Sequence, residues 1–312
     1  MNNTIKPIIM DCDPGHDDAI AMIMALASDK VKVIGVTTAA GNQTIEKTTS
    51  NALRILTFLG RTDIPVAMGM NRPLARELEI APNVHGKSGL DGPSLPEPGF
   101  QPVPQKAFEL TRDLILNSPE PVTIVATGPL TNTALLLLTY PEVKKNIERI
   151  SLMGGGIHNG NWTSAAEFNI LVDPEAAHIV FTSGVPLLMS GLDVTEKAIV
   201  HMDEVEELRA DGGKVSVLVA ELLDFFLKFH LELGFDGAPL HDPCAIATLI
   251  APELFTFEDY FIQIETEGKY TTGMTLADRR VNNKKPSPNA TVAMGVQRKG
   301  LIDLLSTLCK KY

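Results

Sequence analysis

Four aspartates crowd into residues 11–18, which read DCDPGHDD. Carboxylates this close repel one another, so the cluster must bind a cation, hold protons at raised pKa values or be fully solvated. Full solvation is disfavoured, because residues 7–10 are typical of a buried strand and residues 19–27 of a buried helix. Carboxylate oxygens without a nearby Cys or His pair favour Ca²⁺ or Mg²⁺ over Zn²⁺. The run therefore predicts a metal or catalytic site in the turn between two core elements.

Helix capping is the alternative explanation for part of this run. Asp17 or Asp18 could cap the helix that follows and stabilise its positive end. Capping accounts for one acid or two, and it leaves Asp11 and Asp13, which share one side of the strand end because side chains alternate along a strand. We therefore favour the metal or catalytic interpretation.

A second candidate is the sequence His241-Asp242-Pro243. Asp at a helix cap and Pro in the first turn form an ordinary helix start, which explains two of the three residues. A histidine beside a carboxylate at a helix entrance is also suited to act as a general acid or to polarise a leaving group near neutral pH. Taken alone, His241 supports the functional and the structural interpretation equally.

A third candidate comprises amide and acid side chains in polar turns. Asn161 lies shortly before Glu167 and Asn169, and Asn42 lies in another polar turn. Such side chains suit the hydroxyl groups of a sugar, but they also satisfy the backbone of their own turns. For each residue taken alone, the role in its own turn is the favoured explanation.

Other chemistries find little support. Cys244 enters an apolar helix three residues after His241, where a thiol is normally inert packing. The chain lacks a Walker-type phosphate loop, and the glycines at residues 154–156 do not match GxGxxG. An EF-hand would need a glutamate where Met22 stands.

Composition limits the partners and the compartment. The 312 residues carry a net charge of -11, which argues against nucleic acid or an anionic membrane as the main partner. The three cysteines show no paired spacing, as expected in a reducing compartment. The N-terminus lacks a leader pattern and no run of about twenty apolar residues appears, so we expect a cytoplasmic protein that does not cross a membrane.

Strand-like and helix-like segments alternate along the chain. The strand-like runs cover residues 8–10, 31–38, 122–126, 150–153 and 186–189. The helix-like stretches cover residues 44–60, 105–117, 130–138 and 174–183. This alternation predicts an α/β fold with an open, mostly parallel sheet flanked by helices. Because ligands bind beyond the carboxyl ends of such strands, the polar turns should converge on one site.

The rest of the chain predicts a long loop and a small antiparallel addition. Residues 69–104 are rich in Pro and Gly and lack periodicity, which indicates a functional loop or flap. Residues 260–267 and 289–296 look like a closing antiparallel pair near the C-terminus, with residues 278–288 as an exposed connection. No linker divides the chain, so we expect a single domain over residues 1–312.

Seven motifs together resemble the inosine-uridine-preferring nucleoside hydrolase family, over nearly the whole chain. They are DCDPGHDDA at 11–19, AGNQT at 40–44, HGKSGLDGP at 85–93, TGPLTN at 127–132, LMGG at 152–155, GNWTSAAEFN at 160–169 and HDP at 241–243. The likeness is nearest to bacterial pyrimidine-preferring ribonucleoside hydrolases. It implies the nucleoside hydrolase fold, which has a Rossmann-like core.

The resemblance also implies a metal and a general base. Ca²⁺ would be held by Asp13, Asp18, the main-chain carbonyl of Thr127 and Asp242. Asp13 would in addition take a proton from the metal-bound water that attacks C1′ of the ribose, and Asp11 would support it.

The remaining implied contacts are with the substrate. His85 and His241 would face the base, and His241 is the best available proton donor for the leaving group. The implied ribose contacts are Asp17, Asn42, Met153 through its backbone, Asn161, Glu167 and Asn169.

The choice of base rests on aromatic residues. Purine-specific relatives sandwich the base between tryptophans, whereas this chain has one tryptophan, Trp162, and histidines at the corresponding positions. The resemblance therefore implies preference for the pyrimidine nucleosides uridine and cytidine. The chain departs from close relatives in two places: it has Leu233, with Phe235 nearby, where they carry an aromatic residue, and residues 278–288 where they carry an aromatic-rich segment.

We predict a Ca²⁺-dependent hydrolase that releases ribose and free base from a small-molecule nucleoside, serves nucleoside salvage and forms a homodimer or homotetramer. A broad-specificity or purine-accepting hydrolase is the first alternative. A non-catalytic nucleoside- or ribose-binding protein is the second. A metal-dependent phosphohydrolase would need a basic phosphate cradle, and none appears in the sequence.

Overall fold

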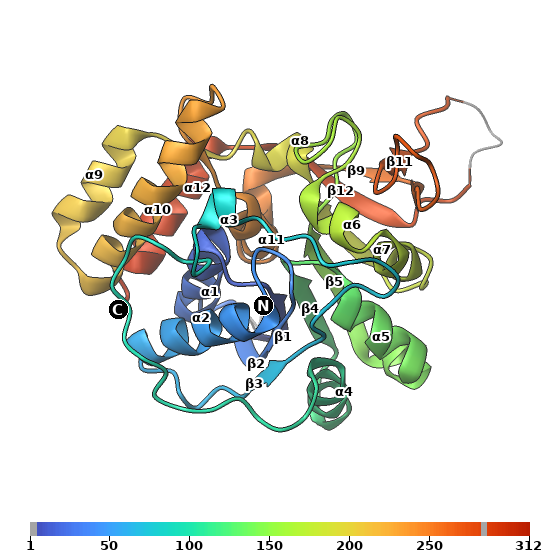
Figure 1. Cartoon of the computed structure of the whole chain (residues 1–312), viewed down its shortest axis with the longest axis horizontal. Helices are drawn as coiled ribbons and strands as arrows, with labels where there is room; N and C mark the ends of the chain where they lie inside the picture. Colours follow the sequence, from blue (N-terminus) through green and yellow to red (C-terminus); the bar gives the residue numbers. More distant parts are fainter. Residues whose placement is uncertain (1–4, 282–285) are drawn as a thin grey trace.

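An eight-stranded sheet forms the centre of the computed structural model, which describes residues 5–281 and 286–312 (Figure 1). In spatial order its strands are β3 (Val66–Met68), β2 (Val31–Thr38), β1 (Lys6–Cys12), β4 (Val122–Ala126), β5 (Ile147–Met153), β6 (Leu187–Ser190), β12 (Ala290–Val296) and β9 (Phe255–Tyr260). Every neighbouring pair is parallel except β12 and β9. The expected α/β fold with an open, mostly parallel sheet is confirmed.

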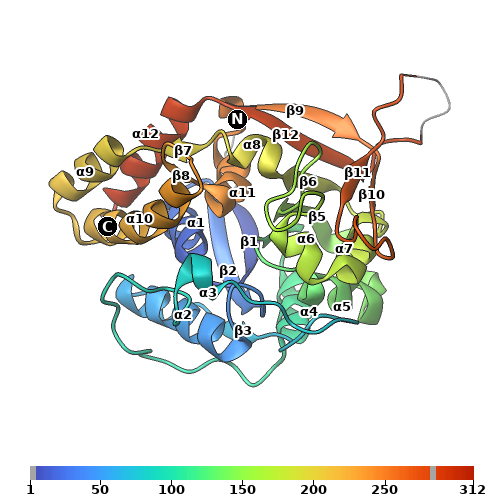
Figure 2. The same cartoon turned by 45° about the horizontal axis from the view of Figure 1, so that its top comes forward.

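Helices cover both faces of this sheet (Figures 1 and 2). One apolar cluster contains Ile8 and Met10 of β1 and side chains of α1 (His16–Ala27), α2 (Ile45–Phe58), α9 (Met202–Asp211), α10 (Lys214–Glu232), α11 (His241–Ile250) and α12 (Arg298–Cys309). The other contains Ile9 and side chains of α4 (Ala107–Asn117), α5 (Thr131–Thr139) and α7 (Pro174–Phe181). Because side chains alternate along a strand, β1 is buried on both faces.

The smaller elements connect these layers. They are α3 (Pro82–His85), α6 (Phe168–Val172), α8 (Leu192–Thr195), the 3₁₀ turns Pro141–Asn146 and Pro252–Leu254, and the two-stranded sheets β7 (Ile199–Val200) with β8 (Ala238–Pro239) and β10 (Ile262–Ile264) with β11 (Thr275–Ala277). Among residues 5–281 and 286–312, no helix combines the length and the apolar character needed to cross a membrane.

The acidic run lies where β1 passes into α1. Gly15 occupies the N-cap position, and its backbone N–H donates to Asp18 Oδ2 over 3.0 Å. The helix is buried from its first residue to Ala25. Asp18 therefore does cap the helix, as the alternative interpretation proposed, but the acids of the first turn also lie inside the protein at the carboxyl edge of the sheet.

The predicted closing pair of strands is wrong in one partner. β12 pairs antiparallel with β9, so residues 290–296 face residues 255–260. The segment that we expected there turns away after Tyr260, and its residues form β10 against β11. The side chain of Asn289 fixes the change of direction, because its amide donates to the Ile262 carbonyl and its oxygen accepts from the Ile262 backbone N–H. Of the predicted exposed connection, residues 282–285 lie outside the described part of the chain.

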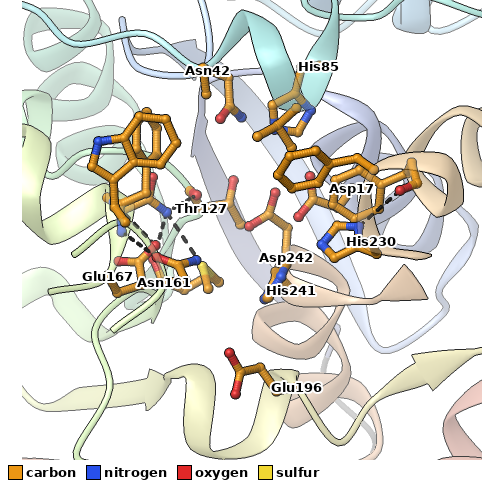
Figure 3. A pocket seen from close by; sticks show the side chains of 18 of the residues that line it. Asp17, Asn42, His85, Thr127, Asn161, Glu167, Glu196, His230, His241 and Asp242 are labelled. Atoms are coloured by element: carbon orange, nitrogen blue, oxygen red, sulfur yellow. Dashed lines mark hydrogen bonds between the residues drawn. The ribbon is translucent and has the colours of Figure 1, made fainter. Parts of the chain in front are cut away.

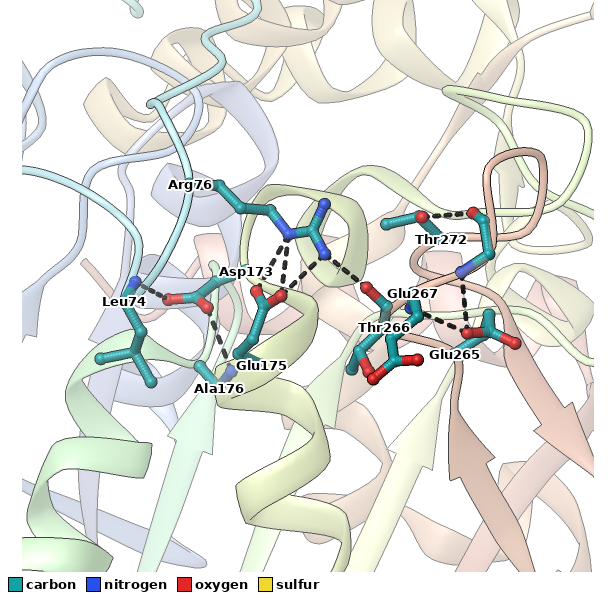
Figure 4. Close-up of polar contacts among 10 residues, drawn as sticks. Leu74, Arg76, Asp173, Glu175, Ala176, Glu265, Thr266, Glu267 and Thr272 are labelled. Atoms are coloured by element: carbon teal, nitrogen blue, oxygen red, sulfur yellow. Dashed lines mark hydrogen bonds and ion pairs between the residues drawn. The ribbon is translucent and has the colours of Figure 1, made fainter.

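The predicted long loop, residues 69–104, contains only α3 as a helix and is tied to the body by Arg76 (Figure 4). The Arg76 guanidinium donates to both carboxylate oxygens of Glu175 on α7 and to the carbonyl of Thr266. The backbone N–H of Leu74 donates to the Asp173 carboxylate over 2.9 Å. These contacts fix the first part of a loop whose middle carries His85.

We expect Arg76→Ala to loosen this loop with a small loss of stability. The ion pair is about one-third exposed on both sides, with side-chain exposures of 34% and 30%, so solvent screening limits the loss to about 1 kcal/mol. Amide hydrogen exchange and limited proteolysis across residues 69–104 measure the loosening. Arg61→Ala is the matched control, because Arg61 pairs with Asp63, which lies only two residues away in the chain. Equal exchange rates in both variants would contradict a tethering role.

Candidate active site

A pocket opens over the carboxyl ends of the strands and gathers residues from distant parts of the chain (Figure 3). All predicted site residues line it except Asp13 and Asp18, which lie beneath its floor. The predicted residues in its wall are Asp17, Asn42, His85, Thr127, Met153, Asn161, Glu167, Asn169, His241 and Asp242. The expected convergence of the polar turns is therefore observed.

The floor of the pocket is acidic. Asp17, Asp18 and Asp242 are buried, and they bring one carboxylate oxygen each to within 4.8 Å of one another. Burial and the neighbouring Asp18 raise the pKa of Asp17 to about 7, and burial with the Asp17 charge raises that of Asp242 well above its usual range. Among the described residues that line the pocket there is no Lys or Arg. Such a set of carboxylates fits a hard divalent cation, which supplies the missing positive charge.

Asp13 lies beside this group with one oxygen unused. Its Oδ2 atom accepts from the backbone N–H of Asn42 over 2.6 Å, whereas Oδ1 is buried and finds no hydrogen-bond partner among the described residues. Burial raises the pKa of Asp13 well above its usual range, and the Asp18 charge adds to this. A Cβ atom at Gly41 or Gly128 would overlap with the Asp13 carboxylate, so both glycines leave the space that it occupies. An unpartnered buried oxygen beside three carboxylates is a further sign of a cation.

Two of the predicted metal ligands, Asp18 and Asp242, belong to the close group of carboxylates, and its third member is Asp17. The predicted ligand set itself stays a prediction. Thr127 contacts Asp18 through its hydroxyl group, which donates to Oδ1 over 2.7 Å, while its carbonyl accepts from the Asn169 amide. The hydroxyl contact was not predicted.

Asp11 is separated from the acidic floor by its own hydrogen bonds. Its carboxylate accepts from the hydroxyl groups of Thr37 and Thr133 and from the side-chain amide of Asn132. Three donors satisfy both oxygens, so Asp11 joins β1, β2 and α5 beneath the site. The supporting role of Asp11 in the reaction stays a prediction.

One wall of the pocket is made of amide and carboxylate groups. Glu167 caps α6, where its oxygens accept from the backbone N–H groups of Gly155, Asn169 and Ile170, and burial raises its pKa. The Asn169 amide donates to the carbonyls of Thr127 over 2.8 Å and Met153 over 3.2 Å. Both side chains therefore serve their own turns and also line the pocket, whereas their contact with a sugar stays a prediction.

The opposite wall is made of histidine and aromatic rings. His85 stacks on His16, and their Nδ1 atoms lie 3.2 Å apart. The His241 Nδ1 atom lies 2.8 Å from the Thr195 hydroxyl. Burial lowers the pKa of His85 well below its usual range and that of His241 to about 3. Both rings are therefore neutral at pH 7 and offer single N–H groups and lone pairs rather than positive charge.

Sequence reasoning missed several residues of the pocket. His230 and the neighbouring rings of Phe226 and Phe229 lie at helical spacing on α10, and none of them was singled out from the sequence. Glu196 was not singled out either, although it lines the pocket, and burial raises its pKa. Leu233 and Phe235 do line the pocket, as the comparison with aromatic relatives suggested. The described residues of segment 278–288 do not.

A hydrogen bond joins two loops at the mouth of the pocket. The Trp162 indole N–H donates to the Glu79 carboxylate, and the indole lies 4.8 Å from the Phe168 ring between centroids. Ala81, Val84 and Leu78 of the long loop complete this small apolar cluster. The loop that carries His85 is thereby connected to the loop that carries Asn161.

The chain is similar in sequence to known ribonucleoside hydrolases. The chain is 58% identical over 304 residues to a pyrimidine-specific ribonucleoside hydrolase, RihA, from Citrobacter koseri, with 96% of each chain covered. It is also 58% identical over 310 residues to the protein of the same name from Escherichia coli, with 98% of this chain and 99% of that one covered.

The solved structures that resemble this chain are nucleoside hydrolases as well. A purine-preferring ribonucleoside hydrolase from Gardnerella vaginalis superposes with a TM-score of 0.91 and 32% identity, over 98% of this chain and 100% of that one. A plant nucleoside hydrolase, PpNRh1, superposes with a TM-score of 0.91 and 34% identity, over 97% and 98%. The family model described as inosine-uridine preferring nucleoside hydrolase matches residues 8–303. The chain therefore belongs to the inosine-uridine preferring nucleoside hydrolase family.

Proposed function

We propose that this protein hydrolyses the N-glycosidic bond of the pyrimidine ribonucleosides uridine and cytidine and releases ribose and free base. The observation that carries the proposal is the buried acidic floor, which faces an amide wall on one side and a wall of neutral histidines on the other. The names of the RihA relatives support the choice of pyrimidines.

We further propose Ca²⁺ as the cation of this site. The residues that would hold it are Asp13, Asp18, the Thr127 carbonyl and Asp242, with Asp17 beside them. When bound, Ca²⁺ would neutralise the acids, engage the diol of the sugar and lower the pKa of a water molecule. Oxygen donors without sulfur or imidazole among the close group support a hard cation.

Asp13 is assigned as the general base. Its unpartnered Oδ1 atom is free to accept a proton, and burial raises its pKa, so that the protonated form is accessible. In the reaction a water oxygen forms the bond to C1′, its proton passes to Asp13 and the bond from C1′ to the base nitrogen breaks. The electron pair of that bond leaves with the base.

We assign the residues of the pocket walls to stabilising the charges that develop in this step. The ribose gains positive charge as the glycosidic bond breaks, and the carboxylates of Asp17 and Glu167 with the oxygens of Asn161 and Asn169 stabilise it. The leaving base gains negative charge. The neutral His241 ring donates a hydrogen bond to it through its N–H group, and His85 lies beside the base.

The proposal also covers the domain organisation, assembly, cellular role and location of the protein. We propose a single domain over residues 1–312, a homodimer or homotetramer, a role in nucleoside salvage and a cytoplasmic location. The net charge of -11 supports a small-molecule substrate over nucleic acid.

The activity is tested by incubating the protein with uridine, cytidine, inosine and UMP, with and without a chelator. We expect ribose and free base from uridine and cytidine, loss of both with chelator and recovery on addition of Ca²⁺.

Asp13→Asn should lower uridine hydrolysis at least about 100-fold, because the proton acceptor is removed. Survival within about tenfold, or about 1.4 kcal/mol of barrier, would rule out Asp13 as the base. Tight binding without release of base would favour a binding protein, and release of phosphate from UMP a phosphohydrolase.

Gly128→Ala tests whether the space beside Asp13 serves the cation. The added Cβ would overlap with Oδ1 of Asp13, so we expect the Ca²⁺ concentration for half-maximal thermal stabilisation to rise at least about tenfold. Gly213→Ala is the control. The atoms nearest to its added Cβ belong to Asp211 and Ser216, at 3.1 Å and 3.5 Å from that Cβ, and neither residue lines the pocket. Unchanged Ca²⁺ dependence in the Gly128 variant would separate Asp13 from the metal.

His241→Ala tests the leaving-group role. A purine leaves more readily when its ring accepts a hydrogen bond, so loss of the N–H donor should slow release from inosine more than from uridine. The values of kcat/KM for the two nucleosides measure this difference. Equal losses on both substrates would argue against donation to the base.

A further inference from the structure

His230 was not anticipated from the sequence, and it occupies a special place in the pocket. It lies in the last turn of α10, is 5% exposed and lines the pocket. Three phenylalanine rings surround it nearly edge-on, with centroids 4.3 Å away for Phe226, 5.2 Å for Phe229 and 5.6 Å for Phe235. An imidazole with these neighbours can hardly change its orientation without disturbing the packing.

The backbone fixes the tautomer of this ring. Its Nδ1 atom lies 2.9 Å from the carbonyl oxygen of Phe226, and because a carbonyl only accepts, Nδ1 must carry the hydrogen. Burial lowers the pKa of His230, so the ring is neutral at pH 7. Its Nε2 atom is then a lone pair, which acts only as a hydrogen-bond acceptor.

This lone pair faces the interior of the pocket (Figure 3). Within residues 5–281 and 286–312, no hydrogen bond reaches Nε2, and the nearest polar ring is His241, whose centroid is 6.1 Å away. The acidic floor and the amide wall bind a cation and a sugar in the proposed function. The space between the aromatic rings and the two histidines is left for a flat apolar ring with polar edges, such as a nucleobase.

We propose that His230 is a specificity-determining residue, whose Nε2 atom accepts a hydrogen bond from an N–H group on the Watson–Crick edge of the base. The inference rests on the proposed function, since it concerns the substrate of that reaction. The N3–H group of uracil and the exocyclic amine of cytosine are donors of this kind. A base that offers only acceptors on this edge leaves the buried lone pair unpaired, which disfavours its binding.

Uridine and 3-methyluridine form the decisive pair of substrates, because the methyl group replaces the N3 hydrogen. In the wild type we expect kcat/KM to favour uridine by about tenfold or more, as for loss of one hydrogen bond together with an unpaired acceptor. His230→Phe keeps a ring in the aromatic surroundings and removes the acceptor. It should lower kcat/KM for uridine about tenfold and change that for 3-methyluridine by less than about twofold.

Two further variants separate recognition from packing. His230→Gln keeps an acceptor near the Nε2 position and should retain part of the preference for uridine, and it also replaces the Phe variant if that fails to fold. Phe229→Leu is the matched control, because it removes a ring from the same helix and the same pocket but no acceptor. It should affect both substrates by the same factor. Equal losses on both substrates in the His230 variants would overturn the proposal.

Binding of the free bases keeps this test separate from the proposed activity. If the wild type released no base from any nucleoside, the proposed function would fail, while calorimetry with uracil and 3-methyluracil would still decide the role of His230. Nitrogen NMR of the labelled imidazoles provides the spectroscopic readout. We expect the neutral Nδ1–H form at pH 7 and a shift of the Nε2 resonance with uracil but not with 3-methyluracil. A resting Nε2–H form would equally overturn the proposal.

Discussion

The constraint on which the site depends is the burial of several carboxylates, with no Lys or Arg among the described residues that line the pocket. Asp13, Asp17, Asp18 and Asp242 all lie beneath or within the pocket floor. Leaving such charges unpaired in a protein interior is costly, and the chain accepts this cost at one edge of its sheet. The partial compensation it offers comes from backbone N–H groups, the Asn42 amide and the Thr127 hydroxyl. A cation would balance the negative charge that these donors leave uncompensated.

The same burial acts in opposite directions on the two sides of the pocket. It favours the neutral form of every titratable group, so it raises the pKa values of the acids and lowers those of the histidines. On the acid side, a bound cation would offset the cost of keeping the buried carboxylates ionised. The histidine side becomes an uncharged hydrogen-bonding surface, and for His230 the backbone carbonyl of Phe226 decides which nitrogen carries the hydrogen. A single physical effect thus gives the two sides of the pocket different properties, which suit the sugar and the base of the proposed substrate.

Much of this arrangement could be predicted from the sequence, because it depends on local patterns. The alternation of apolar runs located β1, β2, β4, β5 and β6, and the rule that ligands bind beyond the carboxyl ends of strands brought their polar turns together. The partner of β12 was missed because the direction of the chain after Tyr260 depends on the distant residue Asn289. His230 was missed because a histidine on a helix with many apolar residues has no local signal of a ligand contact. Its importance follows from three surrounding rings and one backbone carbonyl, which only the packed structure brings together.

The indole that connects the two loops at the mouth of the pocket has an optical consequence. Trp162 is the only tryptophan among the 312 residues, so the indole fluorescence of the protein arises from a single position. That position is hydrogen-bonded to Glu79 of the loop that carries His85, and it packs against Phe168. Separation of the loops would expose the indole to water and remove this hydrogen bond, and both changes alter its emission. The protein thus carries an intrinsic reporter of the contact between these two loops, without any added label.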